Sequence, residues 1–218
     1  MVKLSKTVLP EKVFIKSKDD YQTGVVFKTL CRDCFGKCYI YEHKPIPPVV
    51  EHIVAHKGDL ALEFDWDNML LACAYCNNVK NKRAFDEGIM NPVKIDPEDF
   101  ISFELSFDGL KENVVINAKN CFEDAMLLDK TIKLLDMVYN NSSGRDNQRT
   151  SSANLKNKLS LNLRYFHLLI DNYKTERDSG NYDNILDEIS RGSEFAAFKR
   201  MIIRCDPELF NVFEGALL

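Results

Sequence analysis

Apolar residues recur every three or four positions along the C-terminal half of the chain, a spacing that places them on one face of a helix. Two long helices are predicted in this way. Their apolar stripes are Phe122, Ala125, Leu128, Ile132, Leu135 and Tyr139, and Leu155, Leu159, Leu163, Phe166, Ile170 and Tyr173. Two shorter helices are predicted at about residues 183–190 and 194–204.

The N-terminal part has a different pattern. A short helix is expected over residues 21–31, and the prolines of residues 45–48 then exclude a helix. Residues 49–54 alternate like a strand, and residues 64–68 form a polar loop with one aromatic anchor. Residues 69–83 fit a short strand that runs into a helix. The predicted order is therefore strand, loop, strand, helix.

A hairpin is predicted between the two parts, because strand-like residues 100–107 and 113–116 flank a turn signal at Asp108-Gly109. Two Asx-Pro pairs, Asn91-Pro92 and Asp96-Pro97, mark the linker before it. We therefore predict an α+β protein in two domains. The first is a compact unit at residues 1–90, and the second, at residues 91–218, is a β-hairpin followed by a mainly helical region.

The overall charge gives no reason to expect global attraction to nucleic acid. With 29 Lys and Arg against 33 Asp and Glu, the formal net charge is -4. Binding to DNA must then be local or must be assisted by a partner. We find no apolar run of 18 or more residues and no hydrophobic signal segment, so the expected location is cytoplasmic.

The first predicted strand carries a Glu-His pair that suits metal-dependent hydrolysis of a phosphodiester. This reaction needs a base to activate water and a divalent cation to stabilise the developing charge. His52 can be the base, while Glu51 and Asn77 offer oxygen ligands to Mg²⁺ or a similar ion. Asn68 in the loop can tie the backbone and keep His52 oriented. Neighbouring residues on a strand face opposite sides, so the pair can act together only where the strand end is twisted.

The seven cysteines favour metal over disulfides, because their number is odd and five of them form two groups within the first 80 residues. Cys73 and Cys76 have the CxxC spacing that suits a pair of metal ligands. Cys121 and Cys205 lie on or beside predicted helices and are expected to be buried core thiols.

In order and spacing, the motifs EH, DWDN and CxxCNxxK resemble the ββα-metal motif of HNH endonucleases. More specifically, GKCYIYEHK, VEHIVAHKGD, FDWDNMLLACAYCNNVKNK and SEFAAFKRMIIR resemble the HNH nuclease subunit of Septu-type anti-phage defence systems, also found with some retrons. The strong motifs cover about residues 36–83.

The resemblance implies that residues 1–90 form a ββα-metal nuclease domain with a zinc knuckle. It implies a DNA endonuclease of bacterial anti-phage defence, with His52 as general base and with Glu51 and Asn77 holding catalytic Mg²⁺ or Mn²⁺. His56 matches a further family histidine and would contact the phosphate or the metal-bound water; a loop-pinning hydrogen bond is the alternative.

Three basic residues on or after the helix that carries Asn77 are candidates for DNA contact: Lys80, Lys82 and Arg83. A solvated helix face is the competing interpretation. The resemblance also implies a large ATPase partner of the SMC/Rad50-like class. Residues 194–204 are amphipathic and form either the docking helix for this partner or an ordinary core helix.

The second zinc knuckle is irregular. The family pattern puts it at Cys38 and position 41, which is Tyr41 here. Three outcomes stay open: a zinc held with Cys31 and Cys34, a zinc held with Cys34 and Cys38, or no zinc and Tyr41 packed in its place. Position along the chain favours Cys34, Cys38, Cys73 and Cys76 as the structural zinc ligands.

Two other functions compete with the defence nuclease. One is a non-catalytic zinc-knuckle module that binds nucleic acid or a protein. The other is a stand-alone HNH nuclease of the restriction type.

Overall fold

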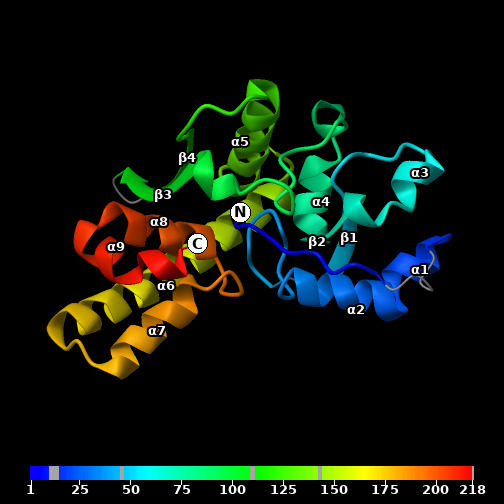
Figure 1. Cartoon of the computed structure of the whole chain (residues 1–218). Coiled ribbons are helices and arrows are strands. Elements are labelled where there is room, and N and C mark those ends of the chain that lie inside the picture. Colours follow the sequence, from blue (N-terminus) through cyan, green and yellow to red (C-terminus); the bar gives the residue numbers. More distant parts are fainter. Residues whose placement is uncertain (10–14, 45–46, 109–110, 142–143, 218) are drawn as a thin grey trace.

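A computed structural model describes residues 1–9, 15–44, 47–108, 111–141 and 144–217. Pro45 and Ile46 of the proline-rich segment and Gly109 of the predicted turn lie outside these residues. The described chain combines helices with two separate two-stranded antiparallel sheets, so the predicted α+β class is confirmed (Figure 1). No helix in these ranges has the length and apolar character needed to cross a membrane.

The N-terminal part has the predicted order of strand, loop, strand and helix. Its elements are α1 (Lys18–Gln22), α2 (Gly24–Asp33), β1 (Pro48–His52), α3 (Leu60–Glu63), β2 (Met69–Cys73) and α4 (Ala74–Lys80). Strand β1 pairs antiparallel with β2, which places His52 opposite Met69. Strand β2 is buried along its whole length. Helix α4 starts directly after it, where Cys73 Sγ accepts a hydrogen bond from the backbone N–H of Cys76 and caps the helix.

Two local features of this part differ from the sequence prediction. The single helix expected over residues 21–31 is divided into α1 and α2 at Gly24, which has a φ of 64°. The loop between the strands contains α3, whose N-cap is Asp59: its carboxylate accepts the N–H of Ala61 at 2.8 Å. Helix α1 packs against β1, and α3 ends at Glu63, whose carbonyl oxygen lies 2.9 Å from His52 Nε2.

The predicted hairpin is confirmed by β3 (Ile101–Asp108) and β4 (Lys111–Ala118), which pair antiparallel over their full lengths. Its inward-facing residues Ile101, Phe103, Val114 and Ile116 are buried. The alternation of apolar and polar residues therefore gives the sheet one buried face, as expected for such a strand pair.

The C-terminal region consists of helices α5 (Ala125–Tyr139), α6 (Asp146–Thr175), α7 (Ser179–Ile189), α8 (Ala196–Cys205) and α9 (Pro207–Phe213). Short 3₁₀ helices occupy residues 66–68, 83–85, 97–99 and 214–216. In α6, every residue of the predicted stripe is buried. Helix α9 was not predicted separately; Asp206 caps it and Pro207 stands at its first position.

The two parts share one hydrophobic core. Ile40, Leu71 and Val79 from the N-terminal part pack in the same cluster as Leu135 and Phe198 from the C-terminal region. A second cluster joins α6, α7 and α9. Figure 1 shows the β1–β2–α4 unit on one side and α6–α9 on the other, with α5 between them.

Helix α8 is a core helix, so the expectation that it docks a partner is wrong and the competing interpretation is confirmed. Both Phe198 and Arg200 are buried in it. The Arg200 guanidinium donates to both carboxylate oxygens of Glu98, at 3.0 and 2.9 Å, and Arg204 donates to Glu98 at 2.8 Å. The charged residues of α8 are buried together with its apolar residues, because their charges are paired.

Candidate functional site

One cavity of about 430 Å³ gathers most of the residues expected to carry the chemistry. Strand β1 contributes Glu51 and His52, the following loop contributes His56, and α4 contributes Asn77 and Lys80. Glu51 and His52 are neighbours on one strand, yet both line this cavity. The end of β1 therefore brings both residues to one cavity.

His52 is held by its Nε2 atom, which lies 2.9 Å from the backbone carbonyl oxygen of Glu63. A carbonyl oxygen only accepts hydrogen bonds, so the Nε2 atom carries the proton and Nδ1 is left with a lone pair. Tyr21 packs against the His52 ring edge-on, with centroids 5.5 Å apart. Burial lowers the pKa of His52 below its usual value, which favours the neutral ring that a general base requires.

His56 lies beside His52, with ring centroids 4.9 Å apart. Its Nδ1 atom is 3.3 Å from the N–H of Gly58 and 3.6 Å from a carboxylate oxygen of Glu63. The expected loop-pinning hydrogen bond is therefore present. These contacts use Nδ1 and not Nε2 of the ring. A contact between His56 and the substrate stays a prediction.

Glu51 pairs with Lys80 at the base of the cavity. Lys80 Nζ lies 2.7 Å from Glu51 Oε1 and donates a second hydrogen bond to the carbonyl oxygen of His52 at 2.8 Å. The two residues are only 7% and 5% exposed. Burial raises the pKa of the Glu51 carboxyl above its usual value, and the Lys80 ammonium opposes that shift.

Asn68 fastens the backbone that follows β1. Its Oδ1 accepts the N–H of Val54 at 2.8 Å, and its Nδ2 donates to the carbonyl oxygens of Val54 and Leu62 at 2.9 and 3.1 Å. Asn68 is buried and does not line the cavity. It joins the segment after His52 to α3, which ends at Glu63, and this is the loop-tying contact expected from the sequence.

The basic residues expected to contact DNA occupy two different environments. Lys82 and Arg83 are exposed just beyond α4. The ammonium of Lys80 is buried in its ion pair with Glu51, and so, contrary to expectation, it does not face solvent. At the cavity rim, Lys57 pairs with Asp86 at 2.6 Å.

Three thiols converge at the start of α4. The Sγ atoms of Cys38, Cys73 and Cys76 all lie within 4.8 Å of one another, and all three residues are buried. Such a group of soft donors could hold a metal ion such as zinc. Three residues of the favoured ligand set, Cys38, Cys73 and Cys76, are therefore brought together, and its fourth member, Cys34, is not. The alternative set with Cys31 and Cys34 does not match this arrangement. Cys121 and Cys205 are exposed, and the prediction of buried core thiols is wrong for both.

The donors lining the 430 Å³ cavity differ from these thiols. Glu51 offers a carboxylate oxygen and Asn77 an amide oxygen from the first turn of α4. Oxygen donors of this kind suit a hard divalent cation such as Mg²⁺ or Mn²⁺. The chain therefore separates a hard-donor cavity from a soft-donor group, with α4 contributing to both.

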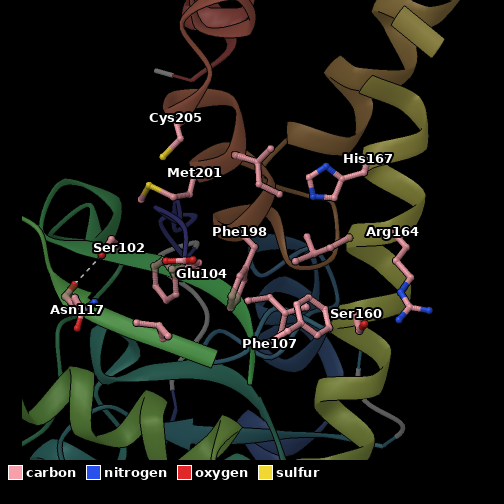
Figure 2. Close-up of a pocket in the computed structure, with 15 residues that line it drawn as sticks. Ser102, Glu104, Phe107, Asn117, Ser160, Arg164, His167, Phe198, Met201 and Cys205 are labelled. Atoms are coloured by element: carbon pink, nitrogen blue, oxygen red, sulfur yellow. Dashed lines mark hydrogen bonds between the residues drawn. The ribbon is translucent and has the colours of Figure 1, made fainter. Parts of the chain in front are cut away.

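A second cavity, of about 500 Å³, lies between the β3–β4 sheet and helices α6 and α8 (Figure 2). Phe198 and Met201 reach it from α8, and Ser160, Arg164 and His167 from α6. Apolar side chains form most of its wall, and none of the expected catalytic residues belongs to it.

Glu63 and Tyr21 both support the histidines and were not predicted from the sequence. Glu63 holds His52 through its backbone carbonyl, which every residue possesses, so its identity gave no signal for that contact. Tyr21 comes from a helix that precedes the motif by thirty positions, and only the fold brings it to His52.

Comparison with known proteins gives no match among family models, curated proteins or solved structures.

Proposed function

We propose that this protein is a metal-dependent DNA endonuclease of the HNH type, acting in bacterial anti-phage defence. The observation that carries the proposal is the His52 ring, which is fixed through Nε2, faces the same cavity as Glu51 and Asn77, and has its pKa lowered by burial. These are the parts that water activation at a phosphodiester requires.

In the proposed mechanism, His52 Nδ1 accepts a proton from the attacking water. The hydrogen bond to the Glu63 carbonyl keeps the proton on Nε2 and holds the ring in place. Glu51 and Asn77 would hold a Mg²⁺ or Mn²⁺ ion, which stabilises negative charge on the phosphate and on the leaving oxygen when bound. His56, on the loop after β1, would donate a hydrogen bond from Nε2 to a phosphate oxygen.

Asn68 is a positioning residue in this scheme. It makes three hydrogen bonds to the backbone on both sides of the His52–Glu63 contact. A ring held by a single hydrogen bond depends on the position of its acceptor, and Asn68 fixes that position.

DNA would approach across the exposed Lys82 and Arg83, next to the cavity. Two exposed cations add little affinity to a chain of net charge -4. This shortage of exposed positive charge supports the proposal that an SMC/Rad50-like ATPase subunit supplies much of the DNA binding. With α8 buried, the partner would use a different surface, and α6 carries three exposed apolar side chains at helical spacing, Leu161, Tyr165 and Leu168.

The test is cleavage of supercoiled and linear DNA by the purified chain, alone and with a co-expressed ATPase of the proposed class, in Mg²⁺, in Mn²⁺ and in EDTA. We expect metal-dependent cleavage that His52→Ala abolishes. His167→Ala is the matched control, because it removes an exposed histidine that lines the other cavity. Cleavage that persists in a folded His52→Ala protein would remove the proposal.

The thiol group favours one function of another class, a zinc-knuckle module that binds nucleic acid or protein without hydrolysis. If the chain is such a module, the wild-type protein will bind DNA or its partner. It will not cleave DNA, even with Zn²⁺ and with Mg²⁺ or Mn²⁺ present. A stand-alone restriction-type nuclease would instead cleave DNA fully without an ATPase.

A further inference from the structure

Two turns meet at the group of three thiols. In the first, at the junction of β2 and α4, the N–H of Cys76 donates to Cys73 Sγ at 3.2 Å. The second begins at Cys38, whose carbonyl oxygen accepts the N–H of Glu42 at 2.8 Å. Tyr41 stands three residues after Cys38, as Cys76 stands three residues after Cys73. Tyr41 therefore occupies the position at which a second CxxC turn would carry its second thiol.

Tyr41 lies beside the thiols. The residue is buried, and it lines one cavity together with Cys73. Cys34 is buried outside the group.

Three sulfur atoms at this spacing leave one corner of a tetrahedron open. Zinc takes four ligands in structural sites, and thiolates are among its preferred donors. Within the described ranges, no further cysteine, histidine or carboxylate joins the three thiols. The hydroxyl of Tyr41 is the side-chain donor that remains next to them.

We propose that Cys38, Cys73 and Cys76 bind one Zn²⁺ ion as thiolates, with the Tyr41 hydroxyl oxygen as the fourth ligand. Binding displaces the thiol protons, which pass to solvent. Tyr41 and Cys73 also line a cavity of about 550 Å³, which gives the ion a path to the site. This proposal does not depend on nuclease activity.

The proposed site connects the two parts of the molecule. Glu42, next to Tyr41, accepts the N–H of Ala197 through its side chain at 2.9 Å and the N–H of Phe195 through its carbonyl oxygen at 3.1 Å. A metal that fixes the turn at residues 38–42 thus also fixes the start of α8 relative to β2 and α4.

Metal analysis of the purified full chain, kept reduced, tests the proposal first. We expect one zinc per chain, lost in Cys76→Ser and kept in Cys34→Ser, the matched change of a buried thiol outside the group. Absence of bound zinc in the reduced wild-type chain, also after incubation with Zn²⁺, would overturn the proposal.

Cobalt substitution then tests the fourth ligand. With Co²⁺ in place of Zn²⁺, Tyr41→Phe should shift the visible d–d bands and release metal to a chelator at least about tenfold more readily. Tyr39→Phe is the control. It removes another buried hydroxyl of the same turn, and this hydroxyl has no hydrogen-bond partner. Unchanged bands and release in Tyr41→Phe would show that water fills the fourth position and would overturn the role of Tyr41.

Tyr41→Cys provides an independent measurement if Tyr41→Phe does not fold, as judged by circular dichroism. A fourth thiolate at this position should strengthen the sulfur-to-cobalt charge-transfer absorption and slow metal release. A Tyr41→Cys protein with the wild-type spectrum would show that position 41 does not reach the ion.

Discussion

Lys80 Nζ lies 2.7 Å from Glu51 Oε1, and both side chains are buried beside the end of β1. The ammonium thus stands against the carboxylate that we expect to hold the catalytic cation. Two cations cannot share one buried carboxylate without strong repulsion. A divalent ion that binds Glu51 must therefore displace the Lys80 ammonium from it.

Replacing Lys80 by Met should accordingly raise the affinity for Mn²⁺. Without metal, the same change leaves Glu51 buried and unpaired, which should lower the free energy of unfolding by about 3–5 kcal/mol. Mn²⁺ titration followed by electron paramagnetic resonance measures the first effect, and urea unfolding with and without Mn²⁺ measures the second. Lys82→Met, at an exposed position, should change neither. Weaker Mn²⁺ binding by a folded Lys80→Met protein would contradict the competition.

Asn68→Ala tests the positioning of His52. Loss of the three hydrogen bonds to the loop backbone frees the acceptor that holds the His52 ring, and a misplacement of about 1 Å can cost roughly 100-fold in rate. We expect the cleavage rate to fall while Mn²⁺ affinity stays unchanged, because Asn68 does not line the cavity. A parallel loss of Mn²⁺ binding would show instead that the whole site had collapsed.

The sequence predicted the elements of this site better than its contacts. The order of strands and helix around His52 followed from local periodicity and turn residues, and so did the buried stripe of α6. The Lys80–Glu51 pair did not, because its partners are 29 residues apart and a basic residue at the end of a helix usually faces solvent. The same limit explains α8, since the sequence could not reveal that Glu98 is the buried partner of Arg200.

Glu98→Gln should destabilise the protein by about 3–5 kcal/mol, because it leaves Arg200 buried without a counter-charge. Arg204 loses its partner in the same change. Urea unfolding at neutral pH measures the loss. Glu208→Gln removes one member of the exposed pair with Arg177 and should cost no more than about 1 kcal/mol. Equal effects of the two substitutions would show that the buried network adds nothing to stability.

Acid should weaken the protein partly through Glu194. Burial opposes ionisation of this carboxyl, but the imidazole of His43 at 2.6 Å and the N–H of Lys44 outweigh it and lower the pKa to about 2. A carboxyl with a lowered folded pKa stabilises the fold above its unfolded pKa of about 4.3 and loses this contribution as the pH falls toward 2. The stability difference between wild type and Glu194→Gln should therefore be largest at neutral pH and shrink below about pH 4.5. A difference that is constant from pH 7 to pH 3 would contradict this assignment.

Gly88 lies against the backbone that follows His52, and its substitution should disturb the site from outside. Its φ is 94°, and a Cβ placed there would lie 3.1 Å from the Ile53 carbonyl oxygen and 3.1 Å from Val54 Cγ2. Gly58 has a similar φ of 89°, but a Cβ there would meet nothing within 4 Å. Both Gly→Ala changes carry the strain of a positive φ, of order 1–3 kcal/mol, and only Gly88→Ala adds the contact with the segment that Asn68 fastens.

We therefore expect similar losses of stability, measured by urea unfolding, with a lower cleavage rate for Gly88→Ala alone. Equal cleavage by the two variants would mean that the position of residues 53–54 does not control the site.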